Sequence, residues 1–203
     1  IAWLPYFNHL GLHLLILSFV FLGANELYSM LSKKTPMPPR AFMVSLTVLI
    51  PLVAAIHSVV PAFVTYTYRW PIGQEIITFA FIFTFLLVLS YEIFTAKEFE
   101  TSNTRIAYSV FMILYAGYLI TFVSRMTVYT MNGKSIATAY LASFLLMVFL
   151  CDSIAWFFGV LLGKNNKGFI AASPNKSIMG FIGGFVGSIG AAILSWFIWP
   201  EIF

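Results

Sequence analysis

Residues 141–163 read LASFLLMVFLCDSIAWFFGVLLG, an apolar run that contains a single charged residue, Asp152. A membrane-spanning helix needs about 20 mostly apolar residues, so this run is long enough to cross a bilayer. Asp152 is the only aspartate in the 203-residue chain. A lone carboxylate in hydrocarbon is costly unless it meets water, a metal ion or a basic partner. The stretch therefore predicts a membrane protein and marks Asp152 as a candidate functional residue.

The composition of the whole chain agrees with this class. Hydrophobic residues make up 61% of the sequence, charged residues only 9%, and the mean hydropathy is +0.93. Such a chain cannot cover a soluble globule with polar surface. We expect an all-α, polytopic membrane helix bundle, a single integral membrane domain over residues 1–203, with a partial helix at residues 1–7. The six expected complete spans are residues 9–31, 41–65, 74–95, 105–127, 136–163 and 178–200.

Basic residues fall mainly in the first, third and fifth connections between these spans. These connections hold eight of the eleven: Lys33, Lys34, Arg40, Lys97, Arg105, Lys164, Lys167 and Lys176. Because basic loops resist translocation, these connections are expected to face the cytosol. The basic residues form no stripe interleaved with aromatic residues, so anionic lipid or a soluble anion is a better expected partner than nucleic acid.

Small residues recur on the expected helix that carries Asp152. Ala155, Gly159 and Gly163 are four residues apart, a spacing that lets a second helix backbone approach closely in a membrane. Asp152 lies on the same face, one turn earlier, so we expect it to point into the bundle. A helix break near Gly159 would bring it closer to the cytosol. The alternative to a functional role is a buried aspartate paired with a neighbouring helix for packing alone.

The connection after this helix contains a helix-start signal. Ser173 and Pro174 are typical of the N-cap and first position of a helix, so we expect the last helix to begin here. Lys176 and the Ser177 hydroxyl would then lie in its first turn, where exposed amides and the helix dipole favour an anion such as phosphate. The alternative is an ordinary capped helix whose lysines lie among lipid headgroups.

Other features are interpreted structurally. The glycines of the last expected helix favour close helix packing; they are Gly180, Gly183, Gly184, Gly187 and Gly190. Cys151 is expected to pack instead of react, and a single cysteine excludes an intrachain disulfide. His9 and His13 have the i, i+4 spacing of a metal pair, but interfacial placement is the preferred interpretation. Glu92 is expected to extend to the membrane surface from a helix end.

Four stretches together resemble the CDP-diacylglycerol synthases, or phosphatidate cytidylyltransferases. They are DSIAWFFG at residues 152–159, GK at 163–164, SPNKS at 173–177 and GFIGGFVGS at 180–188. The family pattern is close to D-x-x-A-[YW]-x-x-G, then G-K, then S-P-x-K-[ST]-x-E-G-x-x-G-G. The joint match is specific, whereas either half alone is not, and weaker similarity extends over most of the chain.

The resemblance implies a nucleotidyltransferase of phospholipid biosynthesis that moves CMP from CTP to phosphatidate, releasing pyrophosphate. Catalytic roles are implied for Asp152, Lys176 and Ser177, and Asp152 would also bind Mg²⁺. Substrate-binding roles are implied for Lys164, Lys167, Ser173 and Asn175. The expected location is a bacterial inner membrane with the site facing the cytosol, in contact with membrane lipid, and the packing signals also suit a homodimer.

Two departures from the family pattern leave alternatives open. Met179 stands where the family usually has glutamate, and the family's H-G-G-x-x-D-R-x-D segment is absent from residues 1–203. We therefore expect the chain to be the inactive middle portion of a synthase, incomplete at both ends. The alternatives are a noncatalytic lipid-binding relative and a proton-coupled membrane carrier.

Overall fold

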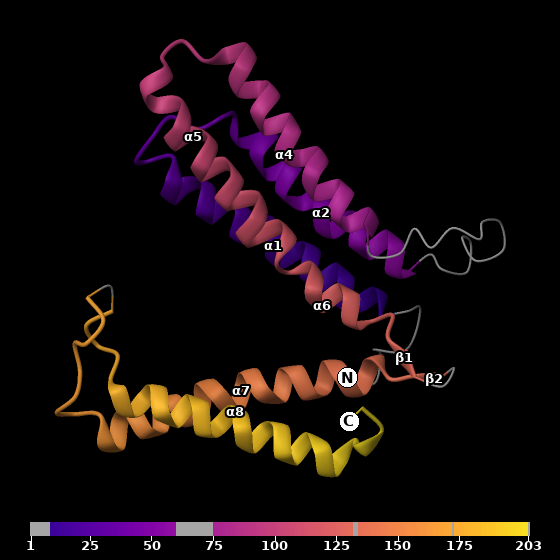
Figure 1. Ribbon diagram of the computed structural model, residues 1–203, viewed down its shortest axis with the longest axis vertical. Coiled ribbons are helices and arrows are strands. Elements are labelled where there is room, and N and C mark those ends of the chain that lie inside the picture. Colours follow the sequence, from indigo (N-terminus) through magenta and orange to yellow (C-terminus); the bar gives the residue numbers. More distant parts are fainter. Residues whose placement is uncertain (1–8, 60–74, 132–133, 172, 203) are drawn as a thin grey trace. The chain divides into compact units, whose positions relative to one another are not determined.

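The computed structural model describes residues 9–59, 75–131, 134–171 and 173–202. The chain forms two compact units, Ile1–Val128 and Tyr129–Phe203. The first unit is an antiparallel bundle of long helices (Figure 1). Its elements are α1 (Leu10–Leu31), α2 (Arg40–Val59), α4 (Glu75–Thr95) and α5 (Phe99–Met112), which continues through the π-helical turn η1 (Ile113–Tyr118) to α6 (Thr121–Met126).

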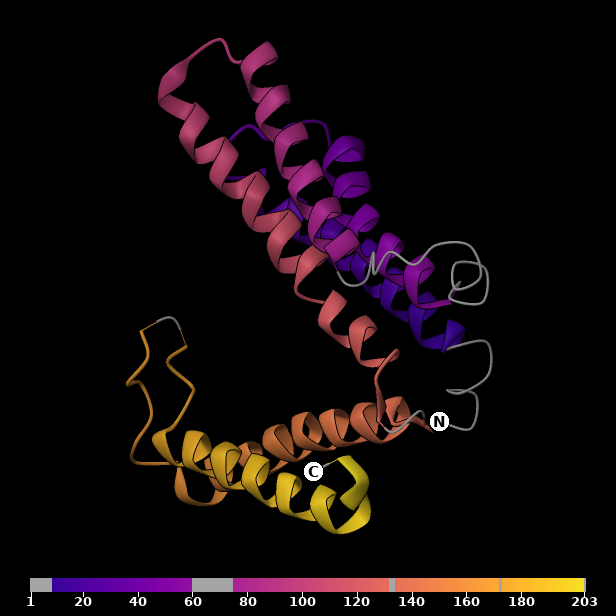
Figure 2. The same cartoon turned by 45° about the vertical axis from the view of Figure 1, so that its right-hand side comes forward.

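The second unit is built on one pair of long helices, as Figures 1 and 2 show from two directions. It begins with a short hairpin, in which Thr130 pairs with Ser135 and Met131 with Lys134. Its elements are β1 (Thr130–Met131), β2 (Lys134–Ser135), α7 (Ala137–Leu162), α8 (Ile178–Ile198) and the 3₁₀ turn η2 (Pro200–Ile202).

The expected fold class is confirmed. In the described part of the chain, six helices are long and apolar enough to cross a membrane, with α5, η1 and α6 forming one of them. The bounds agree with the expected spans to within a few residues except at the fourth, which begins at Phe99 instead of residue 105. The first turns of this helix are polar, so the search for an apolar run missed them. The expected partial helix at residues 1–7 and the end of the second span lie outside the described residues.

Helix α2 lies at the centre of the first unit, against α1, α4 and η1. Met43, Ile50 and Ala54 of α2 are fully buried, together with Ile113 of η1. The approach of η1 to α2 depends on Gly117, because a Cβ there would lie 2.7 Å from the Thr47 carbonyl oxygen. In the most apolar 18-residue stretch of α2, half of the residues are buried, compared with 22% in the same stretch of α1 and of α4. Helix α2 therefore carries most of the packing that holds this unit together.

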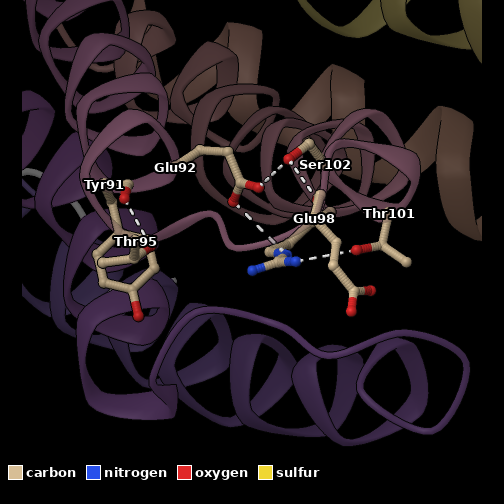
Figure 3. A network of polar contacts seen from close by, with 7 residues as sticks. Tyr91, Glu92, Thr95, Glu98, Thr101 and Ser102 are labelled. Carbon is tan, nitrogen blue, oxygen red and sulfur yellow. Dashed lines mark hydrogen bonds and ion pairs between the residues drawn. The ribbon is translucent and has the colours of Figure 1, made fainter.

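The corner between α4 and α5 contains a buried polar network (Figure 3). Ser102 Oγ donates to Glu92 Oε1 at 2.5 Å, and Arg105 Nε lies 3.5 Å from Glu92 Oε2. Arg105 also donates from Nη2 to Thr101 Oγ1 at 3.0 Å. Glu92 is only 4% exposed, so the expectation that it reaches the membrane surface is wrong. The ion pair and hydrogen bond with α5 keep the carboxylate inside the unit.

His9 and His13 are both buried at the start of α1. His13 Nε2 lies 3.4 Å from Thr127 Oγ1. No group of three His, Cys, Asp or Glu side chains suitable for a metal occurs among the residues that the structure describes.

Candidate functional site

Helices α7 and α8 run antiparallel side by side (Figure 2), and they pack through small residues. A Cβ at Gly183 would lie 2.6 Å from Phe158 Cβ, and a Cβ at Gly187 would lie 2.5 Å from the Leu150 carbonyl oxygen. Such short distances show that the two backbones meet where no side chain fits. The expected packing role is confirmed for these two glycines, whereas a Cβ at Gly190 would have nothing within 4 Å of it.

Helix α7 continues without interruption to Leu162. The break considered near Gly159 does not occur, because Gly159 is paired in the helix and its carbonyl accepts from Gly163 N at 3.1 Å. Asp152 is ten residues before the helix end, about 15 Å along the axis at 1.5 Å per residue. The carboxylate is therefore placed well inside a bilayer-length helix.

The last helix begins at Ile178, where its expected membrane span starts, and not at the helix-start signal of Ser173 and Pro174. Ser177, not Ser173, is the N-cap of α8, and its Oγ accepts a hydrogen bond from Gly180 N at 3.1 Å. Ser173 and Pro174 instead open a turn in which Lys176 N donates to the Ser173 carbonyl at 3.0 Å. The fixed φ of proline suits the second position of a turn as well as the first position of a helix. The prediction of a helix start at Ser173 is wrong for this reason.

The connection between α7 and α8 folds back on itself. Lys167 and Ser177 form an isolated antiparallel bridge, Gly168 N donates to the Lys176 carbonyl at 3.3 Å, and Ile178 N donates to the Asn166 carbonyl at 3.1 Å. Gly168 has a φ of 82°, which favours glycine. These contacts place Lys176 and Ser177 alongside Lys167 and Gly168 on the two arms of the connection, beside the start of α8.

A pocket of about 890 Å³ lies between α7, α8 and their connection. Every residue for which a catalytic or binding role was expected lines it, although the residues come from α7, the connection and the N-cap of α8. They are Asp152, Lys164, Lys167, Ser173, Asn175, Lys176 and Ser177. Met179, which departs from the family pattern, is half-buried and is not among the lining residues. The structure thus brings the seven residues together, while their chemical roles stay predictions.

The charged groups of this pocket are not paired with one another. In the described part of the chain, Asp152 and the three pocket lysines have no hydrogen-bond or ion-pair partner for their side chains. Three lysines and one aspartate give a formal charge of +3 − 1 = +2, and the amino end of the 21-residue α8 adds partial positive charge. The pocket therefore favours an anion, with one free carboxylate available to a cation.

A family model described as the cytidylyltransferase family matches residues 1–202. The chain belongs to the cytidylyltransferase family. Two curated relatives in this family are phosphatidate cytidylyltransferases of Staphylococcus saprophyticus and Staphylococcus epidermidis. They are 32% and 34% identical to this chain over 103 residues, which is 51% of the chain and 36% of each relative. The match thus spans little more than a third of the relatives' length. No solved structure matches the chain.

Divalent cations such as magnesium stabilise the attacking and leaving oxygens in phosphate chemistry. Mg²⁺ prefers oxygen ligands and usually keeps several waters, so one or two protein carboxylates suffice when phosphates supply the rest. Asp152 is the one carboxylate among the residues that line the pocket, and it is exposed and unpaired. The residues fit a magnesium ion shared between Asp152 and the phosphate groups of a ligand, and do not fit a site made by the described protein residues alone.

Several residues of the pocket were not expected in it. Trp156 and Val160 of α7, and Phe181, Phe185 and Ser188 of α8, also line it, as does Cys151 beside Asp152. Phe181, Phe185 and Ser188 recur at helical spacing, so they share one face of α8. That spacing was visible in the sequence, but nothing in it showed which face of α8 borders the pocket.

Proposed function

We propose that the protein carrying this chain transfers CMP from CTP to phosphatidate, releasing pyrophosphate and forming CDP-diacylglycerol. Membership of the cytidylyltransferase family and the names of the two relatives support this activity. The observation that carries the proposal is that Asp152, Lys164, Lys167 and Lys176 line one pocket. A net positive pocket with one free carboxylate suits two anionic substrates and a divalent cation.

The reaction joins a phosphate oxygen of phosphatidate to the α-phosphorus of CTP. The bond from that phosphorus to the bridging oxygen breaks, and the electron pair leaves with pyrophosphate. No base is needed to activate the attacking oxygen, because the phosphatidate phosphate is already ionised near neutral pH. The lysines neutralise the two phosphates as they approach and stabilise the leaving pyrophosphate. Magnesium, when bound, supplies further charge neutralisation at Asp152.

The residues around α8 divide these tasks by position. Lys176 directly precedes the N-cap and lies beside Lys167 on the bridged connection, so both can bind phosphate oxygens. Ser177 Oγ accepts from Gly180 N, which leaves its own hydrogen free to donate to a phosphate. Lys164, Ser173 and Asn175 add charge and hydrogen bonds at the same end of the pocket. We further propose that the pocket faces the cytosol from a bacterial inner membrane and that the protein forms a homodimer.

Replacement of Asp152 tests the proposal. The full-length natural protein and its Asp152→Asn variant are expressed in membranes and supplied with CTP, phosphatidate and Mg²⁺. We expect CDP-diacylglycerol and pyrophosphate from the unmodified protein and a loss of about 100-fold or more in Asp152→Asn, because the carboxylate is the pocket's only anionic ligand. Glu100→Gln is the matched control, since Glu100 is an exposed carboxylate of α5 with no expected role.

Each alternative predicts a different experimental result. A correctly inserted protein that binds phosphatidate but forms no product is a noncatalytic lipid-binding relative. Proton-coupled solute uptake into vesicles without nucleotide turnover indicates a carrier. Full activity in Asp152→Asn, with CDP-diacylglycerol as the product, would support the proposed activity and exclude a catalytic role for Asp152.

A further inference from the structure

The start of α1 carries two histidines that the pocket chemistry does not use. His9 and His13 are one helical turn apart and are only 5% and 1% exposed. His13 belongs to the buried stripe of α1, together with Ile16, Val20 and Ala24. Within the part of the chain that the structure describes, Nδ1 of each histidine ring is buried and has no hydrogen-bond partner. Because buried polar atoms are nearly always paired, two such nitrogens in one turn point to a bound water or ion.

The hydrogen bonds of Thr127 assign the tautomer of His13. Thr127 Oγ1 donates its only hydrogen to the Ser124 carbonyl oxygen at 2.7 Å. His13 Nε2 lies 3.4 Å from the same Oγ1, which can then act only as an acceptor. Nε2 of His13 therefore carries the ring proton, and Nδ1 of the neutral imidazole holds a free lone pair. A lone pair of this kind can bind a metal ion.

The surroundings of His13 are those of a metal-binding imidazole. Such a ring usually donates its second N–H to a neighbouring oxygen, which fixes the tautomer and the orientation of the ring. Thr127, the C-cap of α6, supplies that oxygen from another helix of the first unit. The bond from Thr127 to the Ser124 carbonyl holds the hydroxyl in place. The outer contacts that a metal-binding histidine needs are therefore present before any ion is bound.

His9 is held beside this ring at a cost in backbone conformation. Its φ is 62°, in the left-handed region, which is unfavourable for a residue with a Cβ. The His9 carbonyl oxygen accepts from Leu12 N at 2.9 Å and from His13 N at 3.2 Å. These bonds fix the His9 backbone one turn before His13, although its own conformation is strained. Strain of this kind persists only where the surrounding structure imposes it.

The chemistry of the ligands selects the ion. Imidazole nitrogens suit Zn²⁺ and similar transition-metal ions, whereas Mg²⁺ prefers oxygen ligands. Two histidines spaced i, i+4 on one helix form a familiar zinc-binding pair. Among the described residues, no third His, Cys, Asp or Glu side chain completes the group. Water would then fill the remaining positions of a tetrahedral zinc ion, so the ion should exchange with free zinc in solution.

We propose that His9 and His13 bind one zinc ion through their Nδ1 atoms at the start of α1. The ion connects the amino end of α1 to α6 through the hydrogen bond between His13 and Thr127. It therefore stabilises the first unit. The site does not depend on the proposed function, and its test needs no substrate.

The test measures Zn²⁺ binding by isothermal titration to the full-length protein, purified without a histidine tag. It compares the unmodified protein with His13→Gln and His57→Gln. Glutamine at position 13 keeps an amide that can donate to Thr127 but removes Nδ1. His57 is the remaining histidine of the chain and serves as the matched control. We expect His13→Gln to weaken zinc binding at one site by about tenfold or more, while His57→Gln leaves it unchanged.

The same titration with Asp152→Asn separates this site from the pocket between α7 and α8. We expect zinc binding at the histidine site to be unchanged in Asp152→Asn. An equal loss of binding in Asp152→Asn or His57→Gln, unchanged binding in His13→Gln, or no zinc bound by the unmodified protein would overturn the proposal.

X-ray absorption at the zinc edge gives a readout that needs no variant, so it applies even if His13→Gln fails to fold. We expect the unmodified protein, loaded with one equivalent of Zn²⁺, to show scattering from two imidazole rings. A sulfur ligand or the absence of imidazole scattering would overturn the proposal.

Discussion

The Ser177 hydroxyl closes the first turn of α8 by accepting from Gly180 N. Loss of an N-cap hydroxyl typically costs about 1 kcal/mol, because the freed amide has no partner. We expect Ser177→Ala to lower the free energy of unfolding by about this amount, measured by thermal or denaturant unfolding in detergent. Ser188→Ala is the control on the same helix, since its hydroxyl bonds only to a carbonyl of its own helix. Equal losses in both variants would contradict the capping role.

Glu92 and Arg105 form a pair that is largely removed from water, with side chains 6% and 16% exposed. Removing one partner of such a pair leaves the other charge uncompensated, at a cost of about 3 kcal/mol. We expect Glu92→Gln to destabilise the protein by this order in the same unfolding measurement. The double variant Glu92→Gln, Arg105→Gln should recover part of the loss. A double variant that loses the sum of the two single effects would show that the groups act independently.

At the scale of elements, the α7–α8 pair depends on glycines at particular positions. A Cβ at Gly183 would lie 2.6 Å from Phe158 Cβ and 2.7 Å from the Ile154 carbonyl oxygen. Overpacking of this kind costs about 1–3 kcal/mol. We therefore expect Gly183→Ala to destabilise the helix pair by that amount and to lower the melting temperature of the purified protein.

Gly190 offers a matched control on the same helix. Nothing lies within 4 Å of a Cβ at this position, and alanine favours a helix over glycine by about 0.5–1 kcal/mol. Gly190→Ala should leave stability unchanged or slightly raised. Equal melting temperatures for Gly183→Ala and Gly190→Ala would contradict the role of Gly183 in close helix packing.

At the scale of the whole molecule, the basic connections predict one orientation in the membrane. In the first unit the antiparallel order of α1, α2, α4 and α5 puts connections 32–39 and 96–98 at the same end (Figure 2). Both carry lysine, as does the connection between α7 and α8. Because positive loops remain cytosolic, all three should be reached by reagents from that side.

Single cysteines measure this orientation directly. In a Cys151→Ser background, cysteines at exposed Lys34, Lys97 and Asn165 should react with a membrane-impermeant thiol reagent only from the cytosolic side. A cysteine at exposed Ser135 should react only from the opposite side. Labelling of Asn165→Cys and Ser135→Cys from one side would contradict the predicted arrangement of α7.

The amino-acid sequence alone determined the fold class and named seven of the residues that line the pocket. Bilayer thickness demands apolar runs of a set length, and such runs are visible without a structure. The family-like motifs are local, so Asp152, Lys176 and Ser177 could be named from short stretches. Only the tertiary structure decided where α8 begins, since Pro174 suits a turn and a helix equally, and pairing of residues 166–168 with 176–178 selects the turn. It also decided that Glu92 pairs with Arg105 and that Phe185 and Ser188 line the pocket. Both outcomes depend on which faces of two helices pack against each other. Side-chain packing between segments sets that choice, and the sequence of either segment by itself does not show it.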